Sequence, residues 1–208
     1  MINKPTVEYE KRLKDEGYKV ICGVDEVGRG PWAGPFVAAA VIIPVNESRI
    51  TNNELWKKVN DSKKLSEKQR EEIAEELKKV CIYSIGEVEV EELDKIGMSA
   101  TTQLGFQRAI DGLSQRPDYV LADGFALKGK IPCTAIIRGD SISLSIAAAS
   151  IIAKVYRDNL MCEFDSIYPG YGFNEHKGYG TKLHQESLAK LGPSDIHRKS
   201  FAPIKKML

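Results

Sequence analysis

Hydrophobic positions along this chain follow two periods, one typical of buried strands and the other of amphipathic helices. Runs rich in Val, Ile and small residues predict strands at 18–24 and 36–43, and an alternating run predicts another at 81–90. Two shorter apolar runs that end in carboxylates predict strands at 119–123 and 133–140. Helical patterns separate several of these segments, which indicates an α/β protein.

The helical segments are marked by apolar residues at intervals of three and four and by capping residues. A capping box formed by Ser66 and Gln69 opens a predicted helix over 66–79. The segment 145–160 is almost entirely apolar and small, and its length predicts a buried central helix rather than a strand. Further helices are predicted at 5–16, 98–113 and 181–191.

Length and composition place the chain among ordinary globular proteins. It has 208 residues, of which 42% are hydrophobic and 28% charged, values far from those of disordered, collagen-like or coiled-coil chains. At ~150 residues per domain, this length predicts one domain with an appendage. We expect a peripheral N-terminal segment at 1–17, an α/β core at 18–165 and a helical C-terminal part at 166–208.

Charge and targeting signals narrow the setting. The formal charge is +1, so no global excess identifies a partner, but residues 171–208 carry seven Lys and Arg against three Asp and Glu. No apolar run approaches the ~20 residues of a membrane-spanning helix. Residues 1–17 lack the apolar stretch of a secretory signal. We therefore expect a cytoplasmic protein with a basic C-terminal part.

The cysteines are too far apart in the sequence to form a zinc or redox motif. They stand at Cys22, Cys81, Cys133 and Cys162, with no Cys-x-x-Cys pair. Three of them lie in apolar, strand-like runs, and thiols stay reduced in the cytoplasm. We expect all four to be unpaired and to behave as small hydrophobic residues.

Carboxylates stand at the ends of several predicted strands. Asp25 and Glu26 follow the first strand, and Asp123 and Asp140 end two later ones. Loops at strand ends assemble sites in α/β proteins, so acids distant in sequence can converge there. Convergent carboxylates suit Mg²⁺, and two such ions can promote hydrolysis of a phosphodiester. The four acids therefore predict a metal site.

Two considerations limit this prediction. A turn residue or a helix cap explains any one of these acids equally well when it is taken alone. Successive side chains of a strand also point to opposite faces, which separates Asp25 from Glu26 unless the chain bends at Gly28.

Six blocks, taken in order, resemble the motifs of the ribonuclease HII family. They are GVDEVGRGP at 23–31, DSKKL at 61–65, ADG at 122–124, GDS at 139–141, SIAAASIIAKVYRD at 145–158 and HKGYGT at 176–181. The resemblance extends from about residue 18 to residue 198. It departs from the family at Trp32, where a smaller residue is usual, and it is not close after Gly124.

The resemblance implies a fold and an activity. Enzymes of this family cleave RNA in RNA–DNA duplexes, so the chain would be a metal-dependent endoribonuclease. The implied fold is ribonuclease H-like, a mixed five-stranded sheet flanked by helices with a helical C-terminal extension closing over the duplex. Incision would occur 5′ of ribonucleotides, including those embedded in duplex DNA under repair, and would leave 3′-hydroxyl and 5′-phosphate ends. The short segment before the first strand favours the HII type over the HIII type.

The resemblance also assigns roles to residues. The family's active-site carboxylates, which would be catalytic and would bind two Mg²⁺ or Mn²⁺ ions, match Asp25, Glu26, Asp123 and Asp140. The substrate-binding residues match Gly28, Arg29, Gly30, Lys63 and Tyr179, and weaker candidates are Lys64 and Asp158. In this view Gly28 to Gly30 and Tyr179 recognise the ribonucleotide, and Lys63 contacts phosphate.

Simpler explanations for these residues stay open. The residues alone are equally compatible with a tight turn at 28–30, ordinary exposed lysines and a loop aromatic at Tyr179. Asp158 is either an auxiliary acid near the metals or a surface partner of Arg157.

The implied partners are RNA–DNA hybrids and DNA containing ribonucleotides, bound by a monomer, with a sliding clamp left open as a protein partner. One alternative function is a resolvase-like nuclease of the same fold, which would be indifferent to a 2′-hydroxyl. The other is a non-catalytic nucleic-acid-binding module. Such a module gains nothing from carboxylates directed at phosphates.

Overall fold

A five-stranded sheet forms the centre of the computed structural model, which describes residues 4–44 and 54–208. In the spatial order β3-β2-β1-β4-β5, the strands are β3 (Ile82–Val88), β2 (Phe36–Ile42), β1 (Ile21–Val27), β4 (Tyr119–Asp123) and β5 (Cys133–Ile136). The pairs β1–β2 and β2–β3 are antiparallel, whereas β1–β4 and β4–β5 are parallel. The predicted mixed five-stranded sheet is confirmed.

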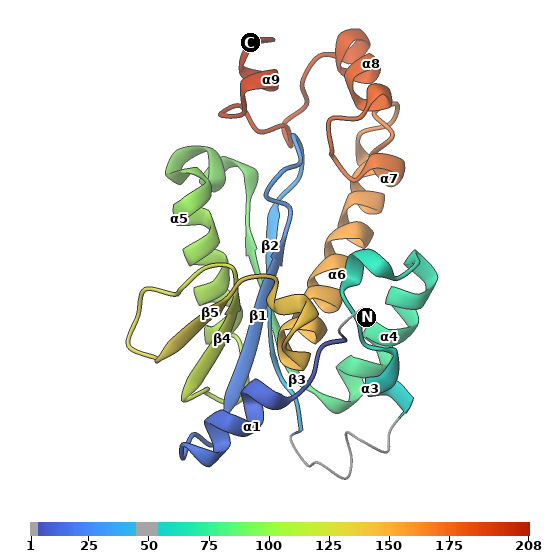
Figure 1. Ribbon diagram of the computed structural model, residues 1–208. Helices are drawn as coiled ribbons and strands as arrows, with labels where there is room; N and C mark the ends of the chain where they lie inside the picture. Colours follow the sequence, from blue (N-terminus) through green and yellow to red (C-terminus); the bar gives the residue numbers. More distant parts are fainter. Residues whose placement is uncertain (1–3, 45–53) are drawn as a thin grey trace.

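Helices cover both faces of this sheet (Figure 1). One face packs on α5 (Val90–Asp111), and the other packs on α6 (Leu144–Ile167) with α3 (Glu54–Lys58) and α4 (Glu67–Val80) beyond it. The remaining helices are α1 (Glu8–Asp15), α7 (Phe173–His176), α8 (Lys182–Leu191) and α9 (Ala202–Lys205), with short 3₁₀ turns η1 (Ser62–Lys64) and η2 (Gly139–Ser141). The helices at 98–113, 145–160 and 181–191 are confirmed to within eight residues at each end, and the capping box of Ser66 and Gln69 is present.

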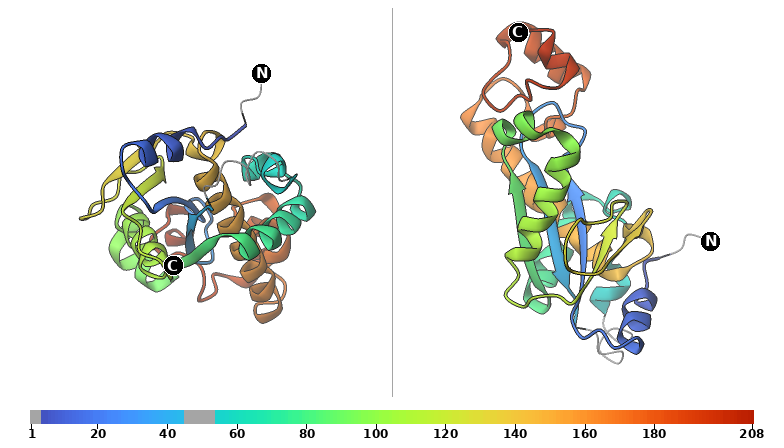
Figure 2. Two further views of the ribbon diagram at one scale, coloured as in Figure 1. Left: turned by 90° about the horizontal axis from the view of Figure 1, so that it is seen from below. Right: turned by 90° about the vertical axis from the view of Figure 1, so that its left-hand side faces the viewer.

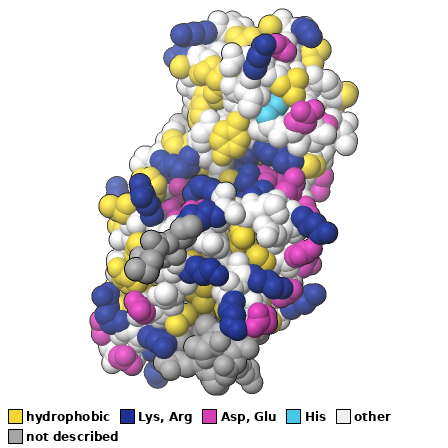
Figure 3. Space-filling model, turned by 45° about the vertical axis from the view of Figure 1, so that its right-hand side comes forward, with side chains coloured by type: hydrophobic (Ala, Val, Ile, Leu, Met, Phe, Trp, Pro, Cys, Tyr) yellow, Lys and Arg dark blue, Asp and Glu magenta, His cyan; other side chains and the backbone are white. Residues whose placement is uncertain are grey.

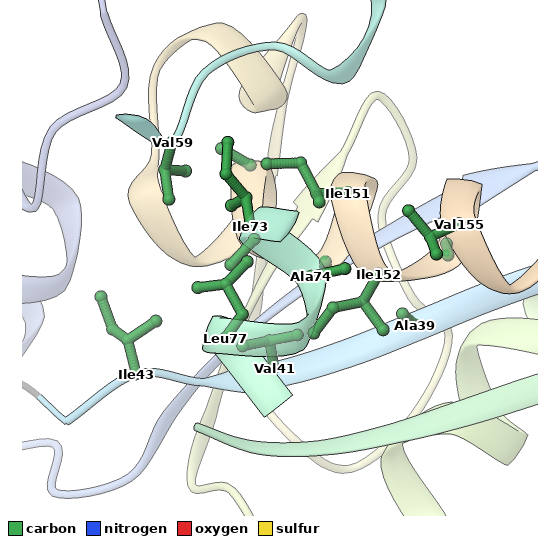
Figure 4. Packing of buried hydrophobic residues seen from close by; sticks show 14 of the residues in the cluster. Ala39, Val41, Ile43, Val59, Ile73, Ala74, Leu77, Ile151, Ile152 and Val155 are labelled. Atoms are coloured by element: carbon green, nitrogen blue, oxygen red, sulfur yellow. The ribbon is translucent and has the colours of Figure 1, made fainter. Parts of the chain in front are cut away.

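Two apolar layers hold the sheet between its helices. Along β2, alternate residues such as Ala39 and Val41 join the layer under α6, and Phe36 and Ala38 join the layer under α5. Figure 4 shows the first layer, where side chains of α4 and α6 meet those of β2. The sheet is therefore buried on both faces, as its nearly continuous hydrophobic strands predict.

The C-terminal elements form a smaller unit beyond the carboxyl end of β1. The last turns of α6 extend past the sheet body and carry α7, α8 and α9 (Figures 1 and 2). A separate apolar cluster fills this unit and includes Met161, Phe173, Leu188 and Ile204. Because the unit stands over the strand ends, an indentation separates it from the sheet body (Figure 3).

Two strand predictions need correction. β1 begins at Ile21 and continues through Asp25 and Glu26, instead of ending before them. β5 ends at Ile136, so Asp140 does not end a strand but lies beyond it in η2. Both differences arise because strand ends are set by pairing with neighbouring strands, which local hydrophobicity does not report.

All four cysteines are free, as predicted, although Cys162 is exposed on α6. Over residues 4–44 and 54–208, each helix is too short or too polar to cross a membrane.

Candidate active site

The four acids singled out in the sequence come from three segments that meet at one end of the sheet. Asp25 and Glu26 lie near the end of β1, Asp123 is the last residue of β4, and Asp140 lies in η2. The parallel register pairs Val24 with the residue before Asp123, so the acid-bearing ends of β1 and β4 lie side by side. This end of the sheet is where sites form in open α/β folds.

Asp25 and Glu26 differ in their surroundings. Asp25 is 4% exposed, and its Oδ1 accepts the backbone N–H of Glu26 at 2.7 Å. Glu26 Oε1 lies 3.8 Å from Arg29 Nε. Its Oε2 is buried and meets no hydrogen-bond partner among residues 4–44 and 54–208. The chain turns directly after β1, at Gly28, where φ is +93°.

Asp123 and Asp140 are positioned by the turn that follows β5. The N–H of Gly139 donates to Asp123 Oδ1 at 2.6 Å. Asp140 is 3% exposed, and its Oδ2 accepts from Lys63 Nζ at 3.1 Å. Asp61 joins the two segments, because it accepts the backbone N–H of Lys63 and the hydroxyl of the η2 serine. The turn at 139–141 and the segment at 61–64 thus form one wall of the site.

The crowding of carboxylates raises their pKa values. Burial raises the pKa of Asp25 well above its ordinary value, and the charges of Glu26 and Asp123 raise it further. Burial raises the pKa of Glu26 to about 7, with Arg29 opposing the rise and Asp123 adding to it. The surroundings of Asp25 and Glu26 therefore disfavour the ionised form of both acids.

Lys63 supplies positive charge to the same cluster. Burial raises the pKa of Asp123, the N–H of Gly139 lowers it, and the charge of Asp140 raises it again, with a net rise. Burial lowers the pKa of Lys63, but Asp140, together with Asp25 and Asp61, raises it, and the net change is a rise. The ammonium group therefore stays protonated beside the acids.

The donor set fits a hard divalent cation such as Mg²⁺ or Mn²⁺, which binds carboxylate oxygens. Buried acids with raised pKa values gain from added positive charge, and within the described residues Glu26 Oε2 has no hydrogen-bond donor. No three His, Cys, Asp or Glu side chains in the described ranges are grouped tightly enough to form a metal cage. Mg²⁺ commonly uses one or two carboxylates together with substrate phosphates, so this open arrangement suits it.

The glycine turn after β1 and Tyr179 lie opposite each other. A Cβ built on Gly30 would lie 3.7 Å from Tyr179 Cε1. Gly28 needs its glycine, because φ is positive there and a Cβ would lie 2.6 Å from the nearest side-chain nitrogen. Tyr179 is 41% exposed and lines a cavity of about 110 Å³ together with Glu26 and Lys63. The structure thus brings these predicted substrate-binding residues to the acid cluster.

Arg29 is held from three sides. Its Nη1 donates to the Thr102 hydroxyl of α5 at 2.5 Å, and its guanidinium lies 4.3 Å from the centre of the Phe125 ring. With Nε beside Glu26, the guanidinium is fixed next to the carboxylates instead of extending into solvent.

The two weaker candidates have protein partners. Lys64 Nζ lies 3.7 Å from Asp61 Oδ2. Asp158 is 5% exposed, accepts from Lys154 Nζ at 2.6 Å, and lies 3.8 Å from Arg70 Nη2. Asp158 therefore orients two cations whose side chains line the same cavity as Tyr179.

The alternative of a surface pair between Asp158 and Arg157 is wrong. Arg157 is fully buried, and its guanidinium donates to the carbonyls of Ala33, Pro35 and Lys177. A guanidinium can satisfy several carbonyls at once, so this side chain ties the start of β2 to the loop that carries Tyr179.

Sequence reasoning missed several residues that border the site. Ser150 and Lys154 stand four residues apart on α6 and line the cavity, and this spacing could have placed them on one helix face. Thr102 and Phe125 hold Arg29 from distant segments, and no local pattern indicates such a contact. Trp32, the departure from the family pattern, packs on the Tyr179 loop: a Cβ at Gly180 would collide with its ring.

The surface around the site is mixed in charge. Figure 3 shows Lys and Arg side chains, with acidic ones between them, along the indentation below the C-terminal part. Positive charge beside a carboxylate cluster suits a ligand that carries phosphates.

A mixed sheet of this order, helical on both faces and with acids at the ends of its parallel strands, defines a ribonuclease H-like fold. The chain belongs to the ribonuclease HII family, whose model matches residues 22–204. Ribonuclease HII of Chlamydia caviae is 51% identical over 203 residues, which cover 96% of this chain and 92% of that protein. The chain is therefore an enzyme of the ribonuclease H type, which acts on RNA–DNA hybrids.

Two solved structures share the fold closely. Ribonuclease H2 of Pyrococcus horikoshii superposes with a TM-score of 0.75 at 27% identity, over 91% of this chain and 97% of that one. The ribonuclease HII of Archaeoglobus fulgidus, solved in complex with PCNA, gives a TM-score of 0.71 at 26% identity, over 86% and 94% of the two chains.

Proposed function

We propose that this chain hydrolyses the phosphodiester bond on the 5′ side of ribonucleotides. The bonds lie in the RNA strand of RNA–DNA hybrids and at single ribonucleotides embedded in duplex DNA. The products carry 3′-hydroxyl and 5′-phosphate ends. This activity would serve to remove ribonucleotides from DNA during repair.

One observation carries the proposal. Four carboxylates from β1, β4 and η2 stand at one end of the sheet, where Glu26 lines a cavity together with Tyr179 and several cationic side chains. A protein that only bound nucleic acid would lose affinity by turning acids toward phosphates. A metal-dependent nuclease needs that arrangement.

Asp25, Glu26, Asp123 and Asp140 would hold two Mg²⁺ or Mn²⁺ ions. Such ions, when bound, lower the pKa of a nucleophilic water and stabilise the charge that develops on the leaving oxygen. The protein's own part is to present carboxylate oxygens at fixed positions: Asp123 is oriented by the N–H of Gly139, and Asp140 by Lys63. Attack by water leaves a 5′-phosphate, whereas attack by the 2′-hydroxyl would leave a cyclic phosphate.

Selection of the ribonucleotide would come from the glycine turn and Tyr179. Gly28 and Gly30 allow the backbone to approach a sugar closely, and the exposed Tyr179 ring lies across the gap. A hydrogen bond from this wall to the 2′-hydroxyl is lost with deoxyribose and leaves polar groups unpaired, at a cost of about 1–3 kcal/mol. Lys63 attracts phosphates of any sequence.

A comparison of three duplexes tests the function. One is an RNA–DNA hybrid, one is duplex DNA with a single ribonucleotide, and one is plain duplex DNA, each assayed in Mg²⁺, in Mn²⁺ and in chelator. We expect cleavage of the first two in either metal and of none in chelator. Cleavage of plain DNA would favour a resolvase-like nuclease, and binding without cleavage in all conditions would favour a non-catalytic module.

Partners beyond nucleic acid are a further part of the proposal. The Archaeoglobus fulgidus relative was solved in complex with PCNA, so we propose a sliding clamp as a protein partner of this chain, which itself acts as a monomer. Light scattering with and without the host's clamp tests both statements: a single-chain mass alone and a larger complex in the mixture are expected.

A further inference from the structure

Three buried histidines surround the loop that carries Tyr179. His176 is 7% exposed, and His184 and His197 are fully buried in the C-terminal part. The rings of His176 and His184 stack with centres 4.4 Å apart, and His184 Nε2 lies 2.9 Å from His197 Nε2. No step of the proposed reaction uses any of the three.

The hydrogen bonds fix the tautomer of the two linked rings. His184 Nδ1 lies 3.0 Å from the carbonyl oxygen of Tyr179, which only accepts, so this nitrogen carries the proton. His197 Nδ1 accepts the backbone N–H of Ser194 at 2.8 Å, so its proton is on Nε2. The remaining contact is then His197 Nε2–H donating to the bare Nε2 of His184. Every donor in this series of hydrogen bonds meets an acceptor only when both rings are neutral.

The third histidine completes the clamp on the loop. His176 Nδ1 accepts the N–H of Gly178 at 3.2 Å, which leaves its Nε2–H to donate to the carbonyl of Tyr171 at 2.8 Å. The carbonyl of His176 accepts the N–H of Tyr179 at 2.9 Å. The N–H of Tyr179 is therefore held by a main-chain carbonyl, and its own carbonyl is held by the His184 ring and by the N–H of Thr181 at 2.8 Å. Of these three bonds, the one from His184 is made by a side chain, and together they fix the direction in which the Tyr179 side chain leaves the backbone.

We propose that His184, oriented by His197, is a positioning residue that aims Tyr179 at the ribonucleotide. The role rests on the proposed function, because it acts through the contact of Tyr179 with substrate. Burial lowers the pKa of both His184 and His197 to about 4, and their neighbouring histidines add to this, so the pair stays neutral at working pH. The hydrogen bonds that run from Ser194 through both rings to Tyr179 are then intact whenever the enzyme binds substrate.

The ring nitrogens themselves provide a test that needs no activity. Two-bond proton–nitrogen NMR spectra of ¹⁵N-histidine-labelled protein at pH 7 should show His184 as the Nδ1–H tautomer and His197 as the Nε2–H tautomer. The variants His184→Phe and His197→Phe assign the signals. A charged ring, or the opposite tautomer at either position, would overturn the proposal.

A double-mutant cycle tests the link to Tyr179. Tyr179→Ala should lower kcat/KM on duplex DNA with one ribonucleotide by about tenfold. His184→Phe keeps a ring but loses both hydrogen bonds, and it should cause a loss of similar size, with little further loss in the double variant. His184→Asn, whose amide can still donate to the Tyr179 carbonyl, should restore part of the rate. Ile73→Val, in the core between α4 and α6, controls for stability.

The outcomes separate the two levels of the argument. If Tyr179→Ala lowers the rate and the loss from His184→Phe multiplies with it, or is absent, the positioning role is wrong while the function stands. If wild type cleaves and Tyr179→Ala does not slow it, the assignment of Tyr179 under the proposed function is wrong and the positioning role fails with it. If His184→Phe lowers only the melting temperature, as Ile73→Val does, the histidines are structural.

Discussion

Asp25 is a carboxylic acid that water barely reaches, with Glu26 and Asp123 close enough to raise its pKa. At neutral pH the unfolded chain holds this carboxylate ionised in water, whereas the folded chain disfavours its ionised form. The raised pKa of Asp25 therefore lowers the stability of the fold at neutral pH in the absence of metal, and a bound cation would relieve that penalty. Function and stability are opposed at this residue.

The substitution Asp25→Asn should stabilise the metal-free protein. It removes one charge with little change in volume, and the amide oxygen can still accept the N–H of Glu26. We expect the free energy of unfolding to rise by about 1–2 kcal/mol in chelator, which corresponds to a rise of about 2–8 °C in melting temperature. Mg²⁺ should raise the melting temperature of wild type but not of the variant, which should also lose hydrolysis. A variant that melts below wild type in chelator would contradict this view of the cluster.

Lys63 and Tyr179 should differ in what they contribute. Lys63→Ala removes an attraction to any phosphate, so binding to plain DNA and to hybrid should both weaken, and the salt slope of binding should fall by about one. Tyr179→Ala should instead lower cleavage at a single ribonucleotide more than it weakens binding to plain DNA. Fluorescence anisotropy across a salt series, together with cleavage rates, measures both effects. Equal losses on all duplexes for both variants would refute the distinction.

Single residues were predictable where a local pattern reports their place. The acids at the ends of hydrophobic runs could be singled out from the sequence, because strand ends are where α/β sites form. That Asp140 sits in η2 could not, since this turn is fixed by the N–H of Gly139 bonding Asp123. The contact of Phe125 with Arg29 could not be predicted either, because the two residues are far apart in the sequence and become neighbours only in the fold.

Between elements, buried guanidinium groups replace apolar contacts at the base of the C-terminal part. Arg157 of α6 bonds three carbonyls at 2.9 Å, and Arg198 bonds the carbonyls of Gly34 and Pro35. Arg198 Nη1 also donates to the carbonyl of Arg29, so these bonds join the start of β2, the glycine turn and the Tyr179 loop. The position of the small unit over the strand ends therefore depends on them.

Arg157→Leu should be strongly destabilising. It leaves the carbonyls of Ala33 and Lys177 without a donor, while Pro35 keeps its bond from Arg198. Each unpaired carbonyl costs about 1–3 kcal/mol, so a loss of about 2 kcal/mol or more is expected. Arg108→Leu on α5 is the matched control, because Arg108 is exposed and pairs with Glu92, and it should change stability by less than about 1 kcal/mol. Urea unfolding of wild type and of the two variants measures both changes in the free energy of unfolding. Equal effects of the two substitutions would show that the carbonyls find other partners.

The histidine pair should make the fold sensitive to acid. His184 and His197 have folded pKa values of about 4, below the ordinary 6.5, because they are buried and adjacent. The unfolded chain then binds more protons, so their contribution to stability is complete above pH 6.5 and is lost as pH falls toward 4. The raised pKa values of the acids change the free energy of unfolding in the opposite direction as pH falls. Wild type is therefore compared with His197→Phe, which keeps the acids and lacks one histidine of the pair. Between pH 7 and pH 5, the free energy of unfolding of wild type, measured with urea, should fall by about 1–3 kcal/mol more than that of this variant. Parallel curves would contradict the shifted values.

At the level of elements, periodicity and capping predicted most helices. The capping box at Ser66 worked because its two hydrogen bonds are local. The pattern missed that α5 begins at Val90, eight residues early, because its first turns are separated from the rest by a non-helical Gly97. Gly97 has a φ of +76°, which glycine adopts more readily than other residues.

For the whole molecule, the sequence alone indicated an α/β chain with a basic C-terminal part, the mixed five-stranded sheet needed the resemblance to a family, and the order of the strands needed the structure. Strand order depends on contacts between residues far apart, which periodicity does not encode. Once assembled, the sheet places acids from β1, β4 and η2 at one end, and α6 carries the small unit with Tyr179 over them. Cleavage and selection would therefore depend on two parts of the molecule facing one another.

The most direct test of this account is the chemistry of the ends produced at one embedded ribonucleotide. Duplex DNA with a single ribonucleotide is incubated with the enzyme in Mg²⁺, and the products are weighed by mass spectrometry, with Asp123→Asn as the matched variant. Hydrolysis by water at carboxylate-bound metal predicts one incision 5′ of the ribonucleotide, with a 3′-hydroxyl and a 5′-phosphate, and no product from the variant or in chelator. A 2′,3′-cyclic phosphate, or full activity of Asp123→Asn, would contradict it.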